Sequence, residues 1–187
     1  SNIQPTPARI TVMTSERHVN DIFDLAGKVV LITGAGGYLG SAMSRALVEA
    51  GATVVASSRQ AEKAREVAAR LSEIDGQHFG IELDHMDSNS IDRGFDEAVS
   101  LAGQVDILVN NGNEGVGGDL TSVSEEQFNR QLQNATGFFL LARRLRDHVV
   151  SRSAAGNIIL LGSMYGIVGS YPDAYEGVCD ASPVGYH

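Results

Sequence analysis

The sequence predicts an α/β fold in which a doubly wound parallel sheet lies between two layers of helices. Four runs of apolar residues, each bounded by Gly, Asp, Asn or Ser, indicate strands at residues 29–32, 53–56, 106–109 and 157–161, and a weaker fifth run covers residues 78–81. The runs are apolar throughout rather than at alternate positions, so both faces of each strand have to be covered. Helical patterns separate the runs, which is the order expected of a parallel sheet with right-handed crossovers.

The first element along the chain is an N-terminal extension, residues 1–24. It holds two prolines, mixed charges and no sustained period, so we expect an extension with one short amphipathic turn. Residues 25–187 are expected to form one domain. A chain of 187 residues is long enough for one proper core but too short for two full domains.

The segments between the strands fit helices. Residues 39–50 place Leu, Met and Ala at helical spacing, residues 60–72 are rich in the helix formers Ala, Glu, Lys and Arg, and residues 88–102 have the same texture. A longer helix is expected to begin at Ser124, where Ser-Glu-Glu-Gln forms a capping box. Its expected apolar stripe consists of Phe128, Leu132, Ala135, Phe139, Ala142, Leu145 and Val149.

Charge and composition argue against several classes of partner. The chain carries 23 acidic and 14 basic side chains, a net charge of -9, which repels nucleic-acid phosphates and anionic lipid heads. No apolar run approaches the roughly 18 residues that a membrane span needs. Cys179 is the only cysteine, so an intrachain disulfide is impossible, and nothing resembles a secretory leader. We therefore expect a cytoplasmic protein that binds neither nucleic acid nor membranes.

A glycine-rich loop follows the first expected strand directly and precedes a helix. Residues 33–40 read Thr-Gly-Ala-Gly-Gly-Tyr-Leu-Gly. Missing side chains let the backbone approach a pyrophosphate, while the helix N-terminus offers N–H groups and partial positive charge to the anion. This context predicts a dinucleotide-binding site, with a purely structural turn as the alternative. The residues assigned to the site are Gly34, Gly36, Gly37, Tyr38, Leu39 and Gly40.

The end of the second expected strand indicates which dinucleotide binds. An Asp or Glu about twenty residues after such a loop binds the ribose hydroxyls of NAD, but this chain has Ser57, Ser58 and Arg59 there. No carboxylate repels a 2′-phosphate at this place, and Arg59 can pair with one while stacking on adenine. We therefore expect NADP(H) in preference to NAD(H), with Ser58 and Arg59 as binding residues. The alternative is that Arg59 is a solvated residue at a helix start.

Together these residues resemble the short-chain dehydrogenase/reductase family, from Lys28 to the last residue. The loop is similar to the family's Thr-Gly-x-x-x-Gly-x-Gly with Tyr38 in place of the second glycine, and it also fits Thr-Gly-x-x-Gly-x-x-Gly of the extended sugar-nucleotide branch. Asn-Asn-Gly-Asn at residues 110–113 resembles the family's Asn-Asn-Ala-Gly motif. The resemblance implies that Asn111 and Gly112 border the cofactor.

Asp84 matches the acid that meets the adenine amino group in this family. The resemblance assigns Asp84 to the cofactor site, and a helix-capping role is the alternative. His85, beside it, is expected on the surface of the loop unless it touches the cofactor. We include both residues in the predicted cofactor site.

The resemblance also implies a catalytic group of Asn, Ser, Tyr and Lys. Asn134 and Ser163 match the first two, although Asn134 has the alternative role of capping or bridging helices. In the family pattern the serine holds the substrate oxygen, and the asparagine positions water or the lysine for proton relay. For the tyrosine we favour Tyr186, because Ala-Ser-Pro-Val-Gly-Tyr-His resembles the stretch before Tyr-x-x-x-Lys in members with an insertion. Tyr175 is the alternative, with nearly the usual spacing from the serine.

The sequence ends at His187, before the position of the family lysine, and the family's last strands and helices do not follow. We therefore expect a fragment of a longer protein, incomplete at its C-terminus. The segment around Ser163 also resembles short-chain enzymes of bacterial surface-sugar pathways.

The function implied by the resemblance is that of an oxidoreductase. It would transfer hydride between NADP(H), or NAD(H), and an alcohol or ketone of a small polar substrate, with a sugar derivative as one option. A dinucleotide-binding protein without turnover and a sugar-nucleotide epimerase or dehydratase are the alternatives. Family members often associate through the helix that begins at Ser124, so we expect a homo-dimer or homo-tetramer. The five histidines lack metal-ligand spacing, so no metal site is expected.

Overall fold

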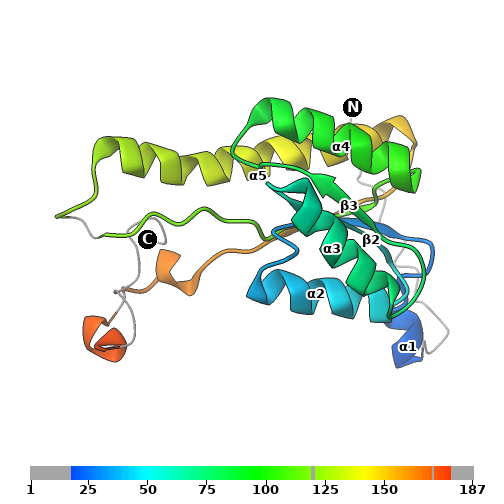
Figure 1. Cartoon of the computed structure of the whole chain (residues 1–187), viewed down its shortest axis with the longest axis horizontal. Helices are drawn as coiled ribbons and strands as arrows, with labels where there is room; N and C mark the ends of the chain where they lie inside the picture. Colours follow the sequence, from blue (N-terminus) through cyan, green and yellow to red (C-terminus); the bar gives the residue numbers. More distant parts are fainter. Residues whose placement is uncertain (1–17, 119–120, 170, 178–187) are drawn as a thin grey trace, which may run out of the picture.

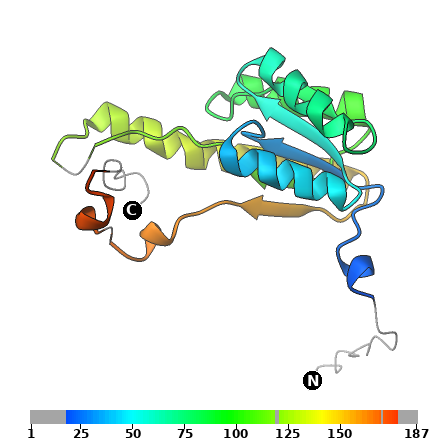
Figure 2. The ribbon, with the colours of Figure 1, turned by 60° about the horizontal axis from the view of Figure 1, so that its bottom comes forward.

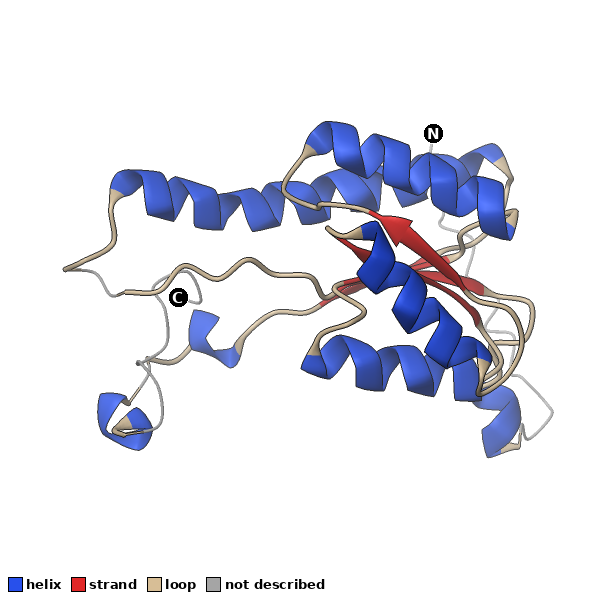
Figure 3. Ribbon diagram, viewed as in Figure 1, coloured by secondary structure: helices blue, strands red, loops and turns tan. Residues whose placement is uncertain are grey.

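A parallel sheet with helices on both faces forms the body of the molecule (Figures 1 and 3). The computed structural model describes residues 18–118, 121–169 and 171–177. The strands are β1 (Val29–Thr33), β2 (Thr53–Ser58), β3 (Phe79–Glu82), β4 (Ile107–Asn110) and β5 (Asn157–Leu160). The helices are α1 (Val19–Ile22), α2 (Tyr38–Glu49), α3 (Ala61–Ser72), α4 (Ser88–Ala102), α5 (Glu125–Ser151) and the short 3-10 turns η1 (Met164–Gly166) and η2 (Pro172–Tyr175).

The strands lie in the order β3-β2-β1-β4-β5, and every neighbouring pair is parallel. The order reverses at β1, because the chain continues first toward β3 and then crosses back to β4. Such a switch point opens a crevice at the carboxyl ends of the strands, where ligands of doubly wound sheets bind. The predicted fold class is therefore confirmed.

Each face of the sheet has its own hydrophobic core. Alternate residues of β1 show the division, because Leu31 packs with residues of α4 and α5 on one face, while Ile32 packs with residues of α2 and α3 on the other. Both side chains are fully buried. This two-sided burial explains why the strand sequences are apolar along their whole length.

The edge strand β5 differs from the inner strands. Its apolar residues Ile158, Ile159 and Leu160 are 43%, 45% and 61% exposed. Beyond β5, residues 161–169 lead away from the sheet on the same side as the first half of α5, as both views show (Figures 1 and 2). None of the helices in the described ranges is both long and apolar enough to cross a lipid bilayer.

The predicted start of α5 is confirmed, but its predicted stripe is wrong in the first half. Ser124 Oγ accepts the Gln127 N–H at 3.2 Å, and Gln127 Oε1 accepts the Ser124 N–H at 2.9 Å, which completes the capping box. Of the expected stripe, Leu145 and Val149 are buried, whereas Phe128, Leu132 and Phe139 are 42%, 51% and 62% exposed.

The buried face of α5 is instead polar or small at its start. Its buried residues are Gln131, Asn134, Gly137, Leu141, Leu145 and Val149. The first half of the helix packs against the polar loop that follows β4, since Gln131 Oε1 accepts the N–H of Val116 at 3.0 Å. Only the second half covers the sheet, so hydrophobicity marks the buried face only there.

Candidate functional site

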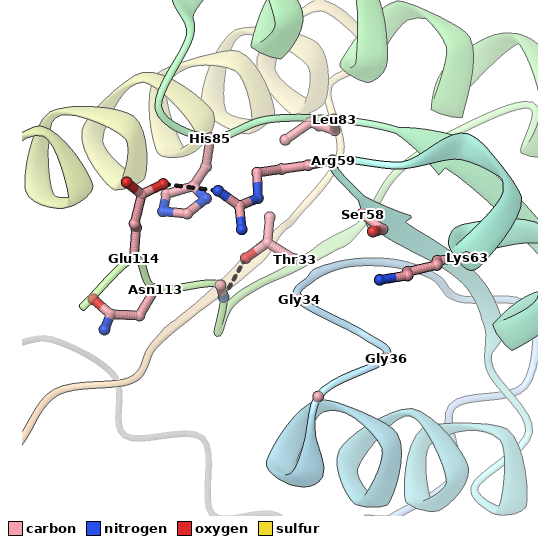
Figure 4. A pocket seen from close by; sticks show the side chains of 12 residues that line it. Thr33, Gly34, Gly36, Ser58, Arg59, Lys63, Leu83, His85, Asn113 and Glu114 are labelled. Carbon is pink, nitrogen blue, oxygen red and sulfur yellow. Dashed lines mark hydrogen bonds and ion pairs between the residues drawn. The ribbon is translucent and has the colours of Figure 1, made fainter. Parts of the chain in front are cut away.

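A cavity of about 310 Å³ opens where β1, β2 and β4 end, on the carboxyl side of the sheet (Figure 4). Its walls come from four segments that are far apart in the sequence. The residues that line it are Thr33, Gly34, Gly36, Gly37, Ser58, Arg59, Lys63, Leu83, His85, Gly112, Asn113 and Glu114. The crevice expected at the switch point is therefore present as a cavity of the size of ligand sites.

The glycine loop forms one wall and turns tightly into α2. A Cβ at Gly40 would lie 2.1 Å from the carbonyl oxygen of Gly34, so the helix approaches the loop as closely as only glycine allows. The Asn111 side chain holds the loop from behind, because its Nδ2 donates to the oxygens of Thr33 at 2.9 Å and Gly34 at 3.1 Å. Gly37 caps α2 without a side chain, which leaves the first N–H groups of the helix available to an anion.

Thr33 ties the end of β1 to the end of β4. Its Oγ1 accepts the N–H groups of Asn111 at 3.0 Å and Gly112 at 2.8 Å. The two walls of the cavity are thus fixed to each other by backbone hydrogen bonds to one buried hydroxyl. Thr33 belongs to the glycine motif, but the sequence did not predict that its hydroxyl joins the ends of two strands.

Two cations stand at the end of β2 and the start of α3. Arg59 follows β2 directly, and Lys63 lies on the first turn of α3; both line the cavity, and both are exposed. Lys63 was not singled out from the sequence, although its position four residues after Arg59 placed it near the same strand end. Together they bring positive charge to the wall opposite the loop after β4.

Glu114 supplies negative charge to the same cavity. Its Oε2 accepts from Arg59 Nη1 at 2.8 Å, and its Oε1 accepts from Arg130 Nε at 2.5 Å. The hydrogen bond from Arg130 holds the pKa of the Glu114 carboxyl below its usual value, against the opposing effect of partial burial. Glu114 was not assigned to the site from the sequence, and its pairing with Arg59 and Arg130 was not expected.

His85 is buried, so its expected place on the surface of a loop is wrong. Its ring lies 17° from parallel to Phe138 and 5.7 Å away, and its Nε2 lies 2.8 Å from Asn134 Oδ1. Because this oxygen can only accept, Nε2 carries a proton. The burial follows from a close approach of α5, since a Cβ at Gly137 would lie 1.9 Å from the oxygen of His85.

Asn134 has a fully engaged side chain. Its Oδ1 accepts the Glu114 N–H at 2.9 Å, and its Nδ2 donates to the oxygens of Glu114 and Gln131, both at 3.0 Å. Asn134 therefore fixes both peptide groups of Glu114 and one nitrogen of His85. It lies just behind the cavity, and its amide links α5 to the loop after β3 and to the loop after β4.

The structure brings most of the predicted cofactor residues together. Seven of them line the cavity: Gly34, Gly36, Gly37, Ser58, Arg59, His85 and Gly112. Gly40 and Asn111 support the glycine loop from behind. Tyr38 and Leu39, the first two residues of α2, are 94% and 61% exposed, and neither lines the cavity.

Asp84 and Ser163 are not among the residues that line the cavity. Asp84 Oδ1 accepts the Met86 N–H at 2.9 Å, whereas the cap of α4 is Asp87. Ser163 is exposed on the segment after β5, where its Oγ accepts the Tyr165 N–H at 3.1 Å.

Of the two tyrosines predicted from the sequence, the structure describes Tyr175. The hydroxyl of Tyr175 contacts that of Tyr165. Tyr186, the favoured tyrosine, lies outside the described residues. Among the residues that the structure describes, no group of three or more His, Cys, Asp or Glu side chains is placed to hold a metal ion.

Comparison with known proteins agrees with this geometry. The family model described as short chain dehydrogenase matches residues 28–174. The 3beta-hydroxysteroid dehydrogenase 1 of Eggerthella lenta is 37% identical over 147 residues, which are 78% of this chain and 56% of that protein. The elsinochrome reductase 1 of Elsinoe fawcettii is 35% identical over 144 residues, 76% of this chain and 53% of that protein. The chain thus spans about half the length of these curated relatives.

Solved structures show the same similarity. A short-chain type dehydrogenase/reductase from Mycobacterium marinum superposes with a TM-score of 0.81 at 29% identity, covering 91% of this chain and 66% of that one. A gluconate 5-dehydrogenase from Burkholderia cenocepacia, solved with NADP and tartrate, gives 0.75 at 27% identity, covering 90% and 62%. Since the family model matches residues 28–174, which include all five described strands and the glycine loop, the chain belongs to the short-chain dehydrogenase family.

Proposed function

We propose that this chain carries the coenzyme-binding half of an oxidoreductase that moves hydride between NADP(H) and an alcohol or ketone. The observation that carries the proposal is the cavity at the sheet switch point, walled by the glycine loop on one side and by Arg59 and Lys63 on the other. Members of the short-chain dehydrogenase family bind a nicotinamide dinucleotide, and this cavity has the donors that such a ligand needs.

The glycine loop fits the pyrophosphate. Gly36 and Gly37 line the cavity without side chains, and the N-terminus of α2 lies immediately after them. Free N–H groups and the positive end of the helix dipole stabilise an anion at this place. The close packing of Gly40 on Gly34 holds the loop in this conformation.

The end of β2 fits a phosphorylated ribose. Ser58, Arg59 and Lys63 line the cavity at this strand end, where NAD-binding proteins carry an acid. A guanidinium and an ammonium favour a 2′-phosphate over a free hydroxyl. The NADP found in the gluconate 5-dehydrogenase from Burkholderia cenocepacia supports this preference by similarity, and NAD(H) is the alternative coenzyme.

The reaction needs a proton as well as a hydride. The coenzyme, when bound, donates or accepts the hydride. We propose that Ser163 holds the substrate oxygen, that Tyr186 exchanges the proton with it, and that Asn134 keeps the surrounding loops in register through its four hydrogen bonds. We propose a small polar alcohol or ketone as substrate, with a sugar derivative included.

Titration of the coenzymes tests the proposal directly. The fluorescence of NADPH and NADH is followed as the full chain is added, and NADPH is expected to bind more tightly. Equal affinities would discard the NADP(H) preference, and no binding of either coenzyme would overturn the function itself. Gly40→Ala, which places a Cβ against the Gly34 oxygen, should weaken binding, whereas Gly117→Ala adds a Cβ that meets nothing within 4 Å and should not.

A further inference from the structure

Glu114 is bound by two arginines that come from different elements of the fold. Arg59 comes from the end of β2 and Arg130 from the first half of α5, and each binds a different oxygen of the carboxylate. The Glu114 side chain is 22% exposed, whereas those of Arg59 and Arg130 are 63% and 52% exposed. The carboxylate is therefore the more buried member of the group, and both arginines are largely exposed to solvent.

Two hydrogen bonds hold the backbone of Glu114 in place. Its N–H and its carbonyl oxygen are both bound by the side-chain amide of Asn134, at 2.9 and 3.0 Å. Figure 4 shows the Arg59 guanidinium directed toward the Glu114 carboxylate, with the hydrogen bond between them drawn as a dashed line. The residue assigned to the ribose 2′-phosphate is thus already engaged by a carboxylate of the same cavity.

We propose that Glu114 is a specificity-determining residue of the coenzyme site, because its carboxylate competes with the 2′-phosphate for Arg59. The inference rests on the proposed function, and it concerns how strongly the site distinguishes phosphorylated from unphosphorylated ribose. Glu114 weakens this discrimination, so the site accepts both coenzymes more evenly than its two cations alone would make it.

Charge explains the direction of the effect. A 2′-phosphate carries up to two negative charges, and a fixed carboxylate on the same arginine both occupies a donor and repels the incoming group. Glu114 remains ionised, since the hydrogen bond from Arg130 keeps the pKa of its carboxyl below the usual value. The Arg59 side chain is exposed enough for a phosphate to displace the Glu114 carboxylate from it. We therefore expect Glu114 to weaken binding of the 2′-phosphate without preventing it.

An orienting role for Glu114 would have the opposite consequence. If the carboxylate mainly held the guanidinium ready for the phosphate, its removal would weaken phosphate binding. The sign of the change in affinity therefore separates competition from orientation.

The test compares two ligands that differ only in the 2′-phosphate, adenosine 2′,5′-bisphosphate and adenosine 5′-monophosphate, by titration calorimetry on the full chain. Glu114→Gln keeps the shape of the side chain and removes its charge. It should tighten the bisphosphate roughly five- to tenfold and leave the monophosphate within about twofold, as expected for one like charge removed near a phosphate. The gain should shrink as salt is raised, because screening weakens the repulsion.

Two controls isolate the pair. In an Arg59→Ala background, Glu114→Gln should no longer favour the bisphosphate selectively, which a double-mutant cycle measures as coupling. Glu49→Gln makes the same chemical change in the exposed Arg45–Glu49 pair on α2 and should alter neither affinity.

The outcomes separate this inference from the proposed function. If the wild-type chain binds neither adenosine ligand nor NADPH, the proposed function is overturned and the inference with it. If both ligands bind but Glu114→Gln leaves their ratio unchanged, or weakens the bisphosphate, the inference alone is overturned and the coenzyme site stands.

Discussion

The two ends of the parallel sheet use the same chemistry for different purposes. At the amino end, Asp106 accepts from Arg152 Nη2 at 2.9 Å, from the Val29 N–H at 3.0 Å and from Gln104 Nε2 at 2.9 Å. At the carboxyl end, Glu114 accepts from two arginines. Each end therefore has one acid held by arginine, and in each the pKa of the carboxyl lies below its usual value.

Burial separates the two groups. The side chain of Asp106 is 8% exposed and that of Arg152 is 25% exposed, whereas the arginines around Glu114 are more than half exposed. A buried pair cannot lose one member without leaving a charge in a poor solvent, while an exposed pair can exchange its partner for water or a ligand. Loss of a partner should therefore cost more stability at the amino end, whereas the exposed arginines at the carboxyl end can exchange their partner.

Helix α5 connects the two ends. Its first half carries Arg130 and Asn134, which both bind Glu114 of the cavity wall. The residue after its last turn, Arg152, binds Asp106 at the start of β4. Removing a partner at one end should therefore have a different consequence from removing one at the other.

The largest expected effect comes from Arg152→Ala at the amino end. This change removes the arginine that is hydrogen-bonded to the buried Asp106 carboxylate, and breaking a buried pair in this way costs about 3 kcal/mol of the free energy of unfolding. Urea unfolding followed by circular dichroism measures the loss, and the affinity for NADPH should stay within about twofold because the cavity is not touched.

Arg130→Ala is the matched control at the carboxyl end. Its side chain is 52% exposed, and Glu114 keeps Arg59, so the loss of stability should be below about 1 kcal/mol. An equal loss from the two substitutions would remove the distinction between the two ends.

The next effect is expected from Gly137→Ala, where α5 crosses the loop after β3. The added Cβ would lie 1.9 Å from the His85 oxygen, so the helix has to move. We expect this movement to lower the free energy of unfolding by about 3 kcal/mol, whereas the higher helix propensity of alanine raises it by about 1 kcal/mol. The net loss of about 2 kcal/mol is measured by the same unfolding experiment. Thr136→Ala, on the exposed neighbouring position, gains propensity without the contact and should be neutral or stabilising; a similar loss there would contradict the reason given.

Local patterns in the sequence were sufficient to predict the five strands and the helices α2 to α5. Leu31 and Ile32 belong to opposite cores, and this two-sided burial is what makes an inner parallel strand readable as a continuous apolar run. The capping box at Ser124 and the glycine loop were also predictable, because the residues that make them lie within a few positions of one another.

Contacts between distant segments were not predictable in this way. Glu114 meets Arg59 only because β2 and β4 end on the same side of the sheet, and His85 is buried only because Gly137 admits α5. The apolar stripe predicted for α5 failed where the helix packs on a polar loop. Candidate residues could be named from motifs, but which of them share a wall depended on tertiary packing.

The smallest expected effect is a pH dependence that belongs to the amino end. Burial, aided by the nearby Arg152, holds the pKa of His148 below its usual value, and the neutral ring accepts the Val105 N–H at 3.2 Å on Nε2. As the pH falls, the His148 ring of the unfolded chain binds a proton before that of the folded chain does. The free energy of unfolding therefore decreases as the pH falls from about 6.5 to the pKa of the folded chain. Urea unfolding at pH 7.5 and 5.5 should show the decrease. His148→Gln can still accept the N–H but does not titrate, so it should flatten that change, and an unchanged slope would assign the pH dependence to other groups.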